Sequence, residues 1–441
     1  MRNQQNFLLT VFFSIVISPL TLAVDKVQTS PFRVEGAINS QFGIVNQKED
    51  FRTELNSDTL YNRNSLVHSG ELKFYYDNIT AKDFRYGAYI ALDSSASKSL
   101  KSSKNIASEL KLYFQGDFGR IELGNTSSVS SSIGINSYSV AKATGGLDGD
   151  WNNWLKNGGV IGAIKDGSSE KDYSINSNYV TSPKLPGMFD ENTKANKVNY
   201  FSPTMHGFLL GLSFTPDSKV KGGIDQTSGV PQNTGGGYKN IWQPTVCYKT
   251  AFNNKIKFTT AVLGEFGKAK KISYSNNDMD ISNNANEKLL AKRNDLKAWQ
   301  ISVGFDYKGL TLAGSYGNIG ESGTLEDTKN SKKNSQYWSL GSAYSTEKYG
   351  ISLNYMQSKR VGILSTVNNS NNDEAIKFQE KEYNQFEVLS IGANYLFMPG
   401  FTPYVEMTKF KFKENKNFNN GGNNAKFNKG TVILAGTKIR F

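Results

Sequence analysis

The sequence of 441 residues has very few of the side chains that build disulfide frameworks and metal centres. Its single cysteine, Cys247, excludes an internal disulfide and a zinc site of the CxxC type. Two histidines, His68 and His206, are too few for a multi-histidine metal centre. We therefore expect no cofactor, and we expect Cys247, which lies in a strand-like pattern, to be a packing residue.

Long apolar runs are absent after residue 23, although a membrane-spanning helix needs about 20 such residues. Hydrophobic residues make up 37% of the chain, and the mean hydropathy is −0.49. The aromatic share of 12% nevertheless excludes a disordered chain, and there are 41 glycines. This combination indicates a large antiparallel β protein.

The first 23 residues have the pattern of a secretory signal peptide: Arg2, an apolar centre from Phe7 to Ile17, and a small-residue ending at Ala23. The alternative is an N-terminal membrane anchor. Cleavage after Ala23 removes Arg2 and changes the formal net charge from +12 to +11. We expect residues 24–441 to form one exported domain.

From residue 32 onward, apolar and polar residues alternate with a period of two. Phe32, Val34 and Ile38 fall on one face, while Arg33 and Glu35 fall on the other. Such alternation predicts strands with one apolar face and one polar face. A soluble antiparallel sandwich has the same pattern, so the connections must distinguish the two.

Short and long connections alternate strictly along the chain. The seven short links are 77–82, 116–119, 203–207, 251–254, 308–309, 346–350 and 398–400. The eight long polar links are 47–64, 94–105, 126–195, 217–238, 267–295, 320–335, 360–383 and 414–429. They predict sixteen strands with all short turns at one end, which is the layout of an outer-membrane β-barrel.

The low hydropathy agrees with a barrel in a membrane. A sheet in a bilayer must close on itself so that every backbone group is paired, and only its outer face must be apolar. Aromatic residues near the strand ends are expected to form interfacial girdles, namely Tyr75, Tyr76, Tyr200, Phe201, Tyr349, Tyr395, Phe397 and Phe441.

Three segments resemble the Gram-negative general porin family. Asp117 to Asn125 is similar to the family's strand before the constriction loop, and Asn199 to Phe208 is similar to the hairpin that follows it. The C-terminal strand ends at Phe441 and looks like the signal that the barrel-insertion machinery recognises. Asn125 stands where the family often has arginine.

The resemblance implies an outer-membrane channel of a Gram-negative bacterium. It also implies a homotrimer in contact with outer-membrane lipid and lipopolysaccharide, and a water-filled pore for small hydrophilic solutes. In this family the third loop folds inward and narrows the pore.

The stretch 126–195 is the longest connection and corresponds to that third loop. Trp151 and Trp154 are placed to anchor it against the inner wall, the alternative being a surface loop with two aromatics. Another alternative is that Tyr173 to Thr181 forms strand pairing, which would give eighteen strands.

Strand parity assigns several charges to the lumen, because charges on the lipid face at mid-membrane cost about 2–4 kcal/mol each. Inward residues on this basis include Arg33, Arg85, Lys111, Arg120 and Glu122. The resemblance suggests a constriction in which Arg33, Arg85 and Arg120 face Asp148, Asp150 and Asp166 of the third loop. Opposed charges would create a transverse field, and we hypothesise a weak anion preference.

The isoelectric point of 9.3 raises the question of nucleic-acid binding. The chain has no long basic run, so we expect no nucleic-acid partner. Three alternatives to a passive pore stay open: an outer-membrane lipase using His68 or His206, a surface adhesin with host-binding loops, and a substrate-specific barrel. The isolated histidines disfavour the enzyme.

Overall fold

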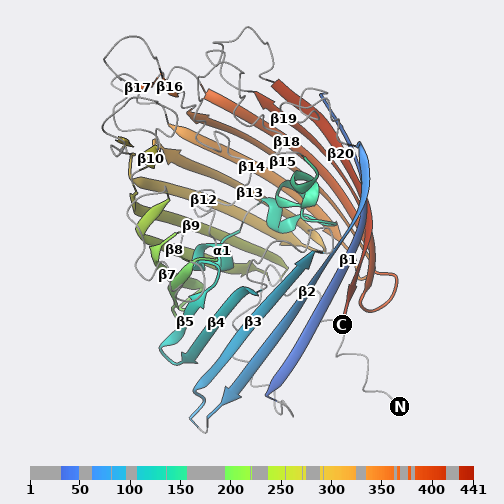
Figure 1. Ribbon diagram of the computed structural model, residues 1–441. Coiled ribbons are helices and arrows are strands. Elements are labelled where there is room, and N and C mark those ends of the chain that lie inside the picture. The colour runs from blue at the N-terminus through green and yellow to red at the C-terminus, as the bar shows by residue number, and fades with distance from the viewer. Residues whose placement is uncertain are drawn as a thin grey trace.

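The computed structural model of the protein contains a closed antiparallel β-barrel (Figure 1). The residues it describes are 31–48, 62–80, 82–95, 107–135, 137–155, 194–218, 220, 237–253, 255–270, 272–274, 289–291, 293–323, 334–361, 365–367, 376–378, 383–413 and 427–441. The proposed signal peptide, Tyr173 to Thr181 and Asp166 lie outside them.

Sixteen strands form the barrel, each paired with its neighbours in chain order. They are β1 (Phe32–Gln47), β2 (Asn64–Ile79), β3 (Arg85–Ser95), β4 (Ala107–Gly116), β5 (Gly119–Asn125), β6 (Asn196–Phe201), β7 (Phe208–Asp217), β8 (Tyr238–Phe252), β9 (Ile256–Ala269), β12 (Leu296–Tyr307), β13 (Leu310–Gly320), β14 (Ser335–Ser345), β15 (Tyr349–Val361), β18 (Tyr383–Tyr395), β19 (Phe401–Lys413) and β20 (Phe427–Arg440). The predicted count of sixteen is confirmed.

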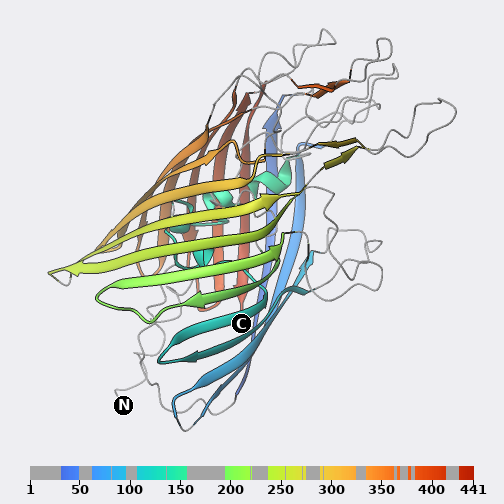
Figure 2. The same cartoon turned by 90° about the vertical axis from the view of Figure 1, so that its left-hand side faces the viewer.

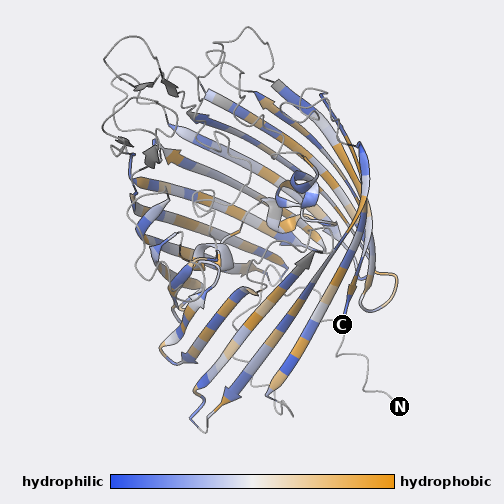
Figure 3. Ribbon diagram, viewed as in Figure 1, coloured by the Kyte–Doolittle hydropathy of each residue, from blue (hydrophilic) through white to orange (hydrophobic). Residues whose placement is uncertain are grey.

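The alternating sequence pattern becomes the two faces of the barrel wall. Large apolar side chains such as Val34, Leu210 and Ile351 point outward and are exposed, whereas their neighbours along the strand point inward. The hydropathy colours alternate along the strands accordingly (Figure 3). Tyr75 and Phe201 were expected in an outer girdle, and this expectation is wrong because adjacent strand residues face opposite ways. The hydroxyl of Tyr75 donates to inward-facing Glu35 at 3.2 Å, and Phe201 is buried in an inner cluster with Val129 of the loop.

The strand ends joined by the short turns and the strand ends that flank the long links lie at opposite ends of the barrel, as the sequence predicted (Figures 1 and 2). The two-residue link Lys308-Gly309 has positive φ at both positions, 46° and 85°, which is the backbone of a tight hairpin turn. At the long-link end, two short hairpins stand apart from the barrel: β10 (Ile272–Tyr274) with β11 (Leu289–Ala291), and β16 (Ser365–Val367) with β17 (Ile376–Phe378).

The barrel closes where β1 pairs with β20, from Ala37 opposite Arg440 to Gln47 opposite Gly430. Phe441 extends this pairing, since its backbone exchanges hydrogen bonds of 2.7 and 3.0 Å with Gly36. Closure removes the free sheet edge that would otherwise leave backbone groups unpaired. No helix within the described residues is both long and apolar enough to cross a membrane.

Candidate functional site

The described part of the third loop, from residue 126 to residue 155, enters the barrel and follows its inner wall (Figures 1 and 2). Four short helices mark its path: α1 (Val129–Ile133), η2 (Ser137–Val140), η3 (Gly146–Asp148) and η4 (Asp150–Trp154). Helix α1 packs against β6, β7 and β8, and η2 packs against β13, β14 and β15. Helix η3 packs against β15, β18 and β19, and η4 packs against β20. The prediction of an inward-folded third loop is confirmed, and the loop spreads over much of the circumference.

Helix α1 covers an apolar part of the wall. The backbone N–H of Val129 donates to Ser213 Oγ at 2.8 Å, which fixes the helix to β7. The apolar cluster beneath comprises Val129, Ile133, Phe201, Leu209, Cys247, Ala261 and Leu263. Cys247 is completely buried in this cluster, which confirms it as a packing residue.

Trp151 anchors the far end of the described loop segment. Its indole ring is fully buried and stacks on Phe386 and Phe410, with ring centroids 6.1 and 5.7 Å apart. Trp154 lies against Gly43 of β1, where an added Cβ would come within 2.7 Å of the indole. The predicted role of both tryptophans as anchors to the inner wall is confirmed.

Inward-facing glycines provide the space that the loop occupies. A Cβ atom added at Gly211 would overlap Val129, and one added at Gly304 would overlap Ile135. A Cβ at Gly341 would approach the carbonyl oxygen of Ser137 to 2.5 Å. These glycines and Gly43 lie on four separated parts of the wall, so together they trace the path of the loop. We call them the wall glycines.

A buried carboxylate on β19 holds the centre of the loop. Glu406 accepts hydrogen bonds from the backbone N–H of Thr144 at 3.2 Å, from its hydroxyl at 2.7 Å, and from the N–H of Gly146 at 3.0 Å. Its side chain is 1% exposed. On β20, Lys438 Nζ donates to the carbonyl oxygen of Ala143 at 2.8 Å. Glu406 therefore binds the hydrogen-bond donors of this loop turn, and Lys438 binds one of its carbonyl acceptors.

Two charged residues of the loop itself are largely buried. Asp150 accepts from Gln41 Nε2 at 3.1 Å and from Asn39 Nδ2 at 3.5 Å. Burial raises the pKa of Asp150, while Lys438 and the two amide donors act in the opposite direction. Burial also lowers the pKa of the Lys142 ammonium. The two amide hydrogen bonds of Asp150 therefore hold η4 against β1.

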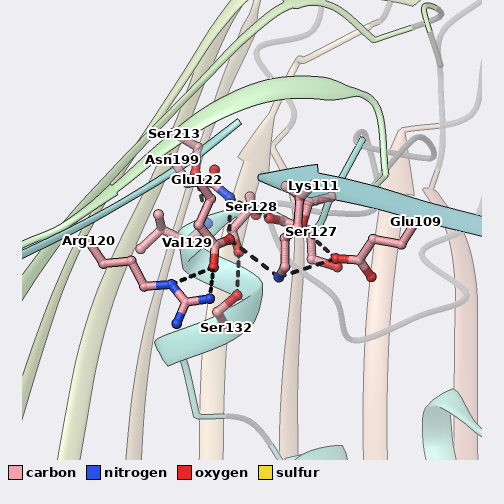
Figure 4. Close-up of polar contacts among 11 residues, drawn as sticks. Glu109, Lys111, Arg120, Glu122, Ser127, Ser128, Val129, Ser132, Asn199 and Ser213 are labelled. Atoms are coloured by element: carbon pink, nitrogen blue, oxygen red, sulfur yellow. Dashed lines mark hydrogen bonds and ion pairs between the residues drawn. The ribbon is translucent and has the colours of Figure 1, made fainter. Parts of the chain in front are cut away.

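The inner wall formed by β1 to β5 carries charged side chains, and Figure 4 shows the charged side chains of β4 and β5. Arg120 donates from Nε and Nη2 to one oxygen of Glu122 at 2.9 and 2.8 Å. Lys111 Nζ lies 3.5 Å from both Glu122 and Glu109. Asn199 connects this cluster to the loop, because its amide nitrogen lies 3.4 Å from Glu122 and donates to the Ser127 carbonyl oxygen at 2.8 Å.

Tyrosine rings support the cations of this wall. The guanidinium carbon of Arg33 lies 4.2 Å from the centroid of Tyr75, that of Arg120 lies 4.3 Å from Tyr113, and Lys111 Nζ lies 5.2 Å from Tyr89. Stacking on a ring limits the rotamers of a cation and keeps it on the wall. The Arg33 side chain remains 51% exposed.

The structure thus brings some of the predicted site residues together and separates others. Lys111, Arg120 and Glu122 form one ion-paired group, and Arg85 lies nearby, across from Gln115, which is itself across from Arg120. Asp150 binds Asn39, six residues or about 20 Å along β1 from Arg33. Asp148 lies in η3, partly exposed.

Sequence analysis missed Glu406, Tyr89 and Tyr113. The signal for Glu406 is an acid at an inward position of β19 between Tyr404 and Thr408. The histidines do not assemble a catalytic pair: His68 is exposed within β2, and His206 lies in a short turn.

A family model described as Gram-negative porin matches residues 21–415. An uncharacterized protein of Rickettsia typhi is 25% identical over 97% of this chain and 98% of its own length, and one of Rickettsia bellii is 24% identical over 96% and 95%. The anion-selective porin from Comamonas acidovorans has a similar fold, with a TM-score of 0.54 and 13% identity, covering 93% of this chain and 99% of that one. With its barrel, its inward loop and this match, the chain belongs to the Gram-negative porin family.

Proposed function

We propose that the protein is an outer-membrane channel through which small hydrophilic solutes and ions diffuse without any covalent chemistry. One observation carries the proposal: an apolar outer face and a charged inner wall share the same closed barrel, with a loop seated inside it. The apolar outer face is suited to contact with lipid, and the charged inner wall is suited to contact with water.

The finer proposal is a weak anion preference, with Arg33, Arg85, Lys111, Arg120, Glu122, Asp148, Asp150 and Asp166 lining or narrowing the pore. The inward charges of β1 to β5 are nearly balanced: the basic residues Arg33, Lys73, Arg85, Lys111 and Arg120 share this wall with the acidic residues Glu35, Glu71, Asp77, Asp93, Glu109 and Glu122. Near-equal numbers of the two signs agree with a preference that is weak. Its anion direction rests on the anion selectivity named for the Comamonas protein.

Three further parts of the proposal follow from the family. Residues 1–23 act as a signal peptide, Phe441 is part of the insertion signal for the barrel-assembly machinery, and the mature barrel forms a homotrimer among outer-membrane lipid and lipopolysaccharide. Phe441 is well placed for such a role, since it is 68% exposed at the closing seam.

Single-channel recording in a planar bilayer tests the function. We expect stepwise openings of single channels. In a tenfold salt gradient, we expect a small reversal potential whose sign corresponds to a higher permeability for the anion than for the cation. Purified, correctly folded barrel that leaves the bilayer silent would refute the channel. Clear cation preference would refute only the anion bias.

A further inference from the structure

Lysines collect on the outer face of the barrel at the long-link end of three strands, β15, β19 and β20, which neighbour one another except for β18 between β15 and β19. They are Lys359 near the end of β15, Lys409, Lys411 and Lys413 among the last five residues of β19, and Lys429 near the start of β20. Along each strand, these lysines alternate with buried residues that point inward. They point to the same outer side as Leu353, Met407 and Ile433 on the same strands. We call these five residues the lysine patch.

The strand register places these charges close together. Lys411 lies directly across from Lys429 on one side and from Glu387 on the other, with Lys411 Nζ 3.6 Å from Glu387 Oε2. Lys413 and Lys359 lie on either side of Gln385. Five lysines and one glutamate leave these six groups with a charge of +4. Like charges directly opposite each other destabilise a sheet, so the arrangement favours an anionic ligand.

The lysine patch lies at the level of the membrane interface. The cross-strand row just below it is apolar: Leu353, Ile391, Met407 and Ile433. A tilted strand crosses the hydrocarbon core in about 9–11 residues, so a crossing that starts at Phe401 ends near Lys411. The cross-strand row of Lys411 continues through Glu387 and Gln357 to outward-facing Trp338 of β14, which is 41% exposed. Tryptophan is typical of that interface.

We propose that the lysine patch binds the phosphate groups of an anionic lipid in the outer leaflet. Ammonium groups on neighbouring strands, directly above an apolar face, match a phosphorylated headgroup above its acyl chains. A second copy of the chain is the less suitable occupant, because lysine is depleted in protein–protein interfaces and five lysines repel a basic partner. The inference rests on the proposed membrane location, but it does not depend on the solutes that the channel passes.

Native mass spectrometry of the purified full-length protein with bis-phosphorylated lipid A tests the proposal. The variant Lys411→Gln/Lys429→Gln removes two charges from the lysine patch. Lys268→Gln/Lys297→Gln is the matched control, since it removes two lysines near the same end of β9 and β12. We expect about a tenfold or greater loss of lipid affinity in the first variant and little change in the second.

Further measurements make each outcome decisive. Lys411→Arg/Lys429→Arg keeps the charge and should keep the lipid, and dephosphorylated lipid A should bind weakly to every form. Equal lipid retention by wild type and the glutamine variant overturns the proposal, as does equal binding of dephosphorylated lipid. Loss of chemically crosslinked oligomers with lipid binding intact would assign the patch to a second copy and overturn it too. Single-channel conductance confirms that the variants fold, and wild type that binds lipid without conducting would refute the channel alone.

Discussion

The inner surface of this barrel has two walls of opposite character. From β6 to β20 it lies largely beneath the third loop, and buried apolar residues such as Leu209, Leu263 and Phe410 are mixed there with small buried polar residues and with buried Glu406. From β1 to β5 it presents ion pairs and tyrosine rings, and Arg33 is half exposed. Both walls have the same backbone pattern, so the difference lies only in which side chains the inward positions carry.

The comparison shows that inward-facing does not mean water-facing. The loop-covered wall behaves as half of a protein core, completed by the loop, whereas the charged wall behaves as a surface. Under the proposed function, ion selectivity then depends on the charged wall, and the loop-covered wall determines where the loop lies. Four substitutions test this division, from the largest expected effect to the smallest.

Trp151→Ala should weaken the apolar contact most. Removing a fully buried indole that stacks on Phe386 and Phe410 should cost about 3–5 kcal/mol of local stability. Hydrogen exchange of the amides of residues 129–155 measures this loss, and a looser loop should make the open-channel current noisier. The control Trp299→Ala removes an outward indole that is 44% exposed and should leave loop exchange unchanged. Equal exchange in both variants would contradict a loop anchored by Trp151.

Glu406→Gln should release the loop turn around Thr144. An amide offers one acceptor oxygen where the carboxylate offers two, so we expect a loss of about 2–3 kcal/mol in local stability. Exchange of the Thr144 and Gly146 amides should accelerate. The half-exposed Glu35→Gln serves as the control. Unchanged exchange at Thr144 would show that Glu406 does not hold the loop.

Gly211→Ala should displace α1, because the new Cβ would overlap Val129. Overpacking of this kind costs about 1–3 kcal/mol, and exchange of the α1 amides should rise. Gly314→Ala is the matched control, since its Cβ would have ordinary contacts of 3.4 and 3.5 Å. The same exchange rates at α1 in both variants would argue against a close fit of helix and wall.

Lys111→Glu changes the charged wall and should act on selectivity. A unit charge at 4 Å in water contributes about 1 kcal/mol, which is about fivefold in a permeability ratio. We expect the reversal potential to shift toward cations, with loop exchange little affected. Lys297→Glu makes the same charge change outside the lumen. A shift of equal size in that control would indicate an effect of net charge and not of the wall.

The sequence was sufficient to predict the strands, the barrel end that carries the short turns, and the closure of sixteen strands. All three depend on the period of two and on the link lengths, which are local properties of the sequence. The inward direction of Arg33, Lys111 and Arg120 followed from the same parity. Tyr75 was assigned to the outer face because it is an aromatic residue near a strand end, although its position in the alternating pattern places it on the inner face.

The partners across the lumen could not be predicted. Glu406 meets Thr144 and Gly146 over a separation of 260 residues or more, and no local pattern encodes such a contact. The ion pair of Arg120 with Glu122 lies within one strand, yet the expected counter-charges were those of the loop. Inward apolar residues on β7 to β9 were the available signal for the loop's position, since a water-filled lumen gives them no reason to be there.

The wall glycines have a consequence for how such a protein can change over generations. Each wall glycine lies against one particular loop residue, so a single inserted residue between 129 and 154 would move the later loop residues away from their glycines at once. Length variation in the third loop should therefore be confined to the stretch after residue 155. Ordinary substitutions before that point should occur in matched pairs, one on the loop and one on the barrel.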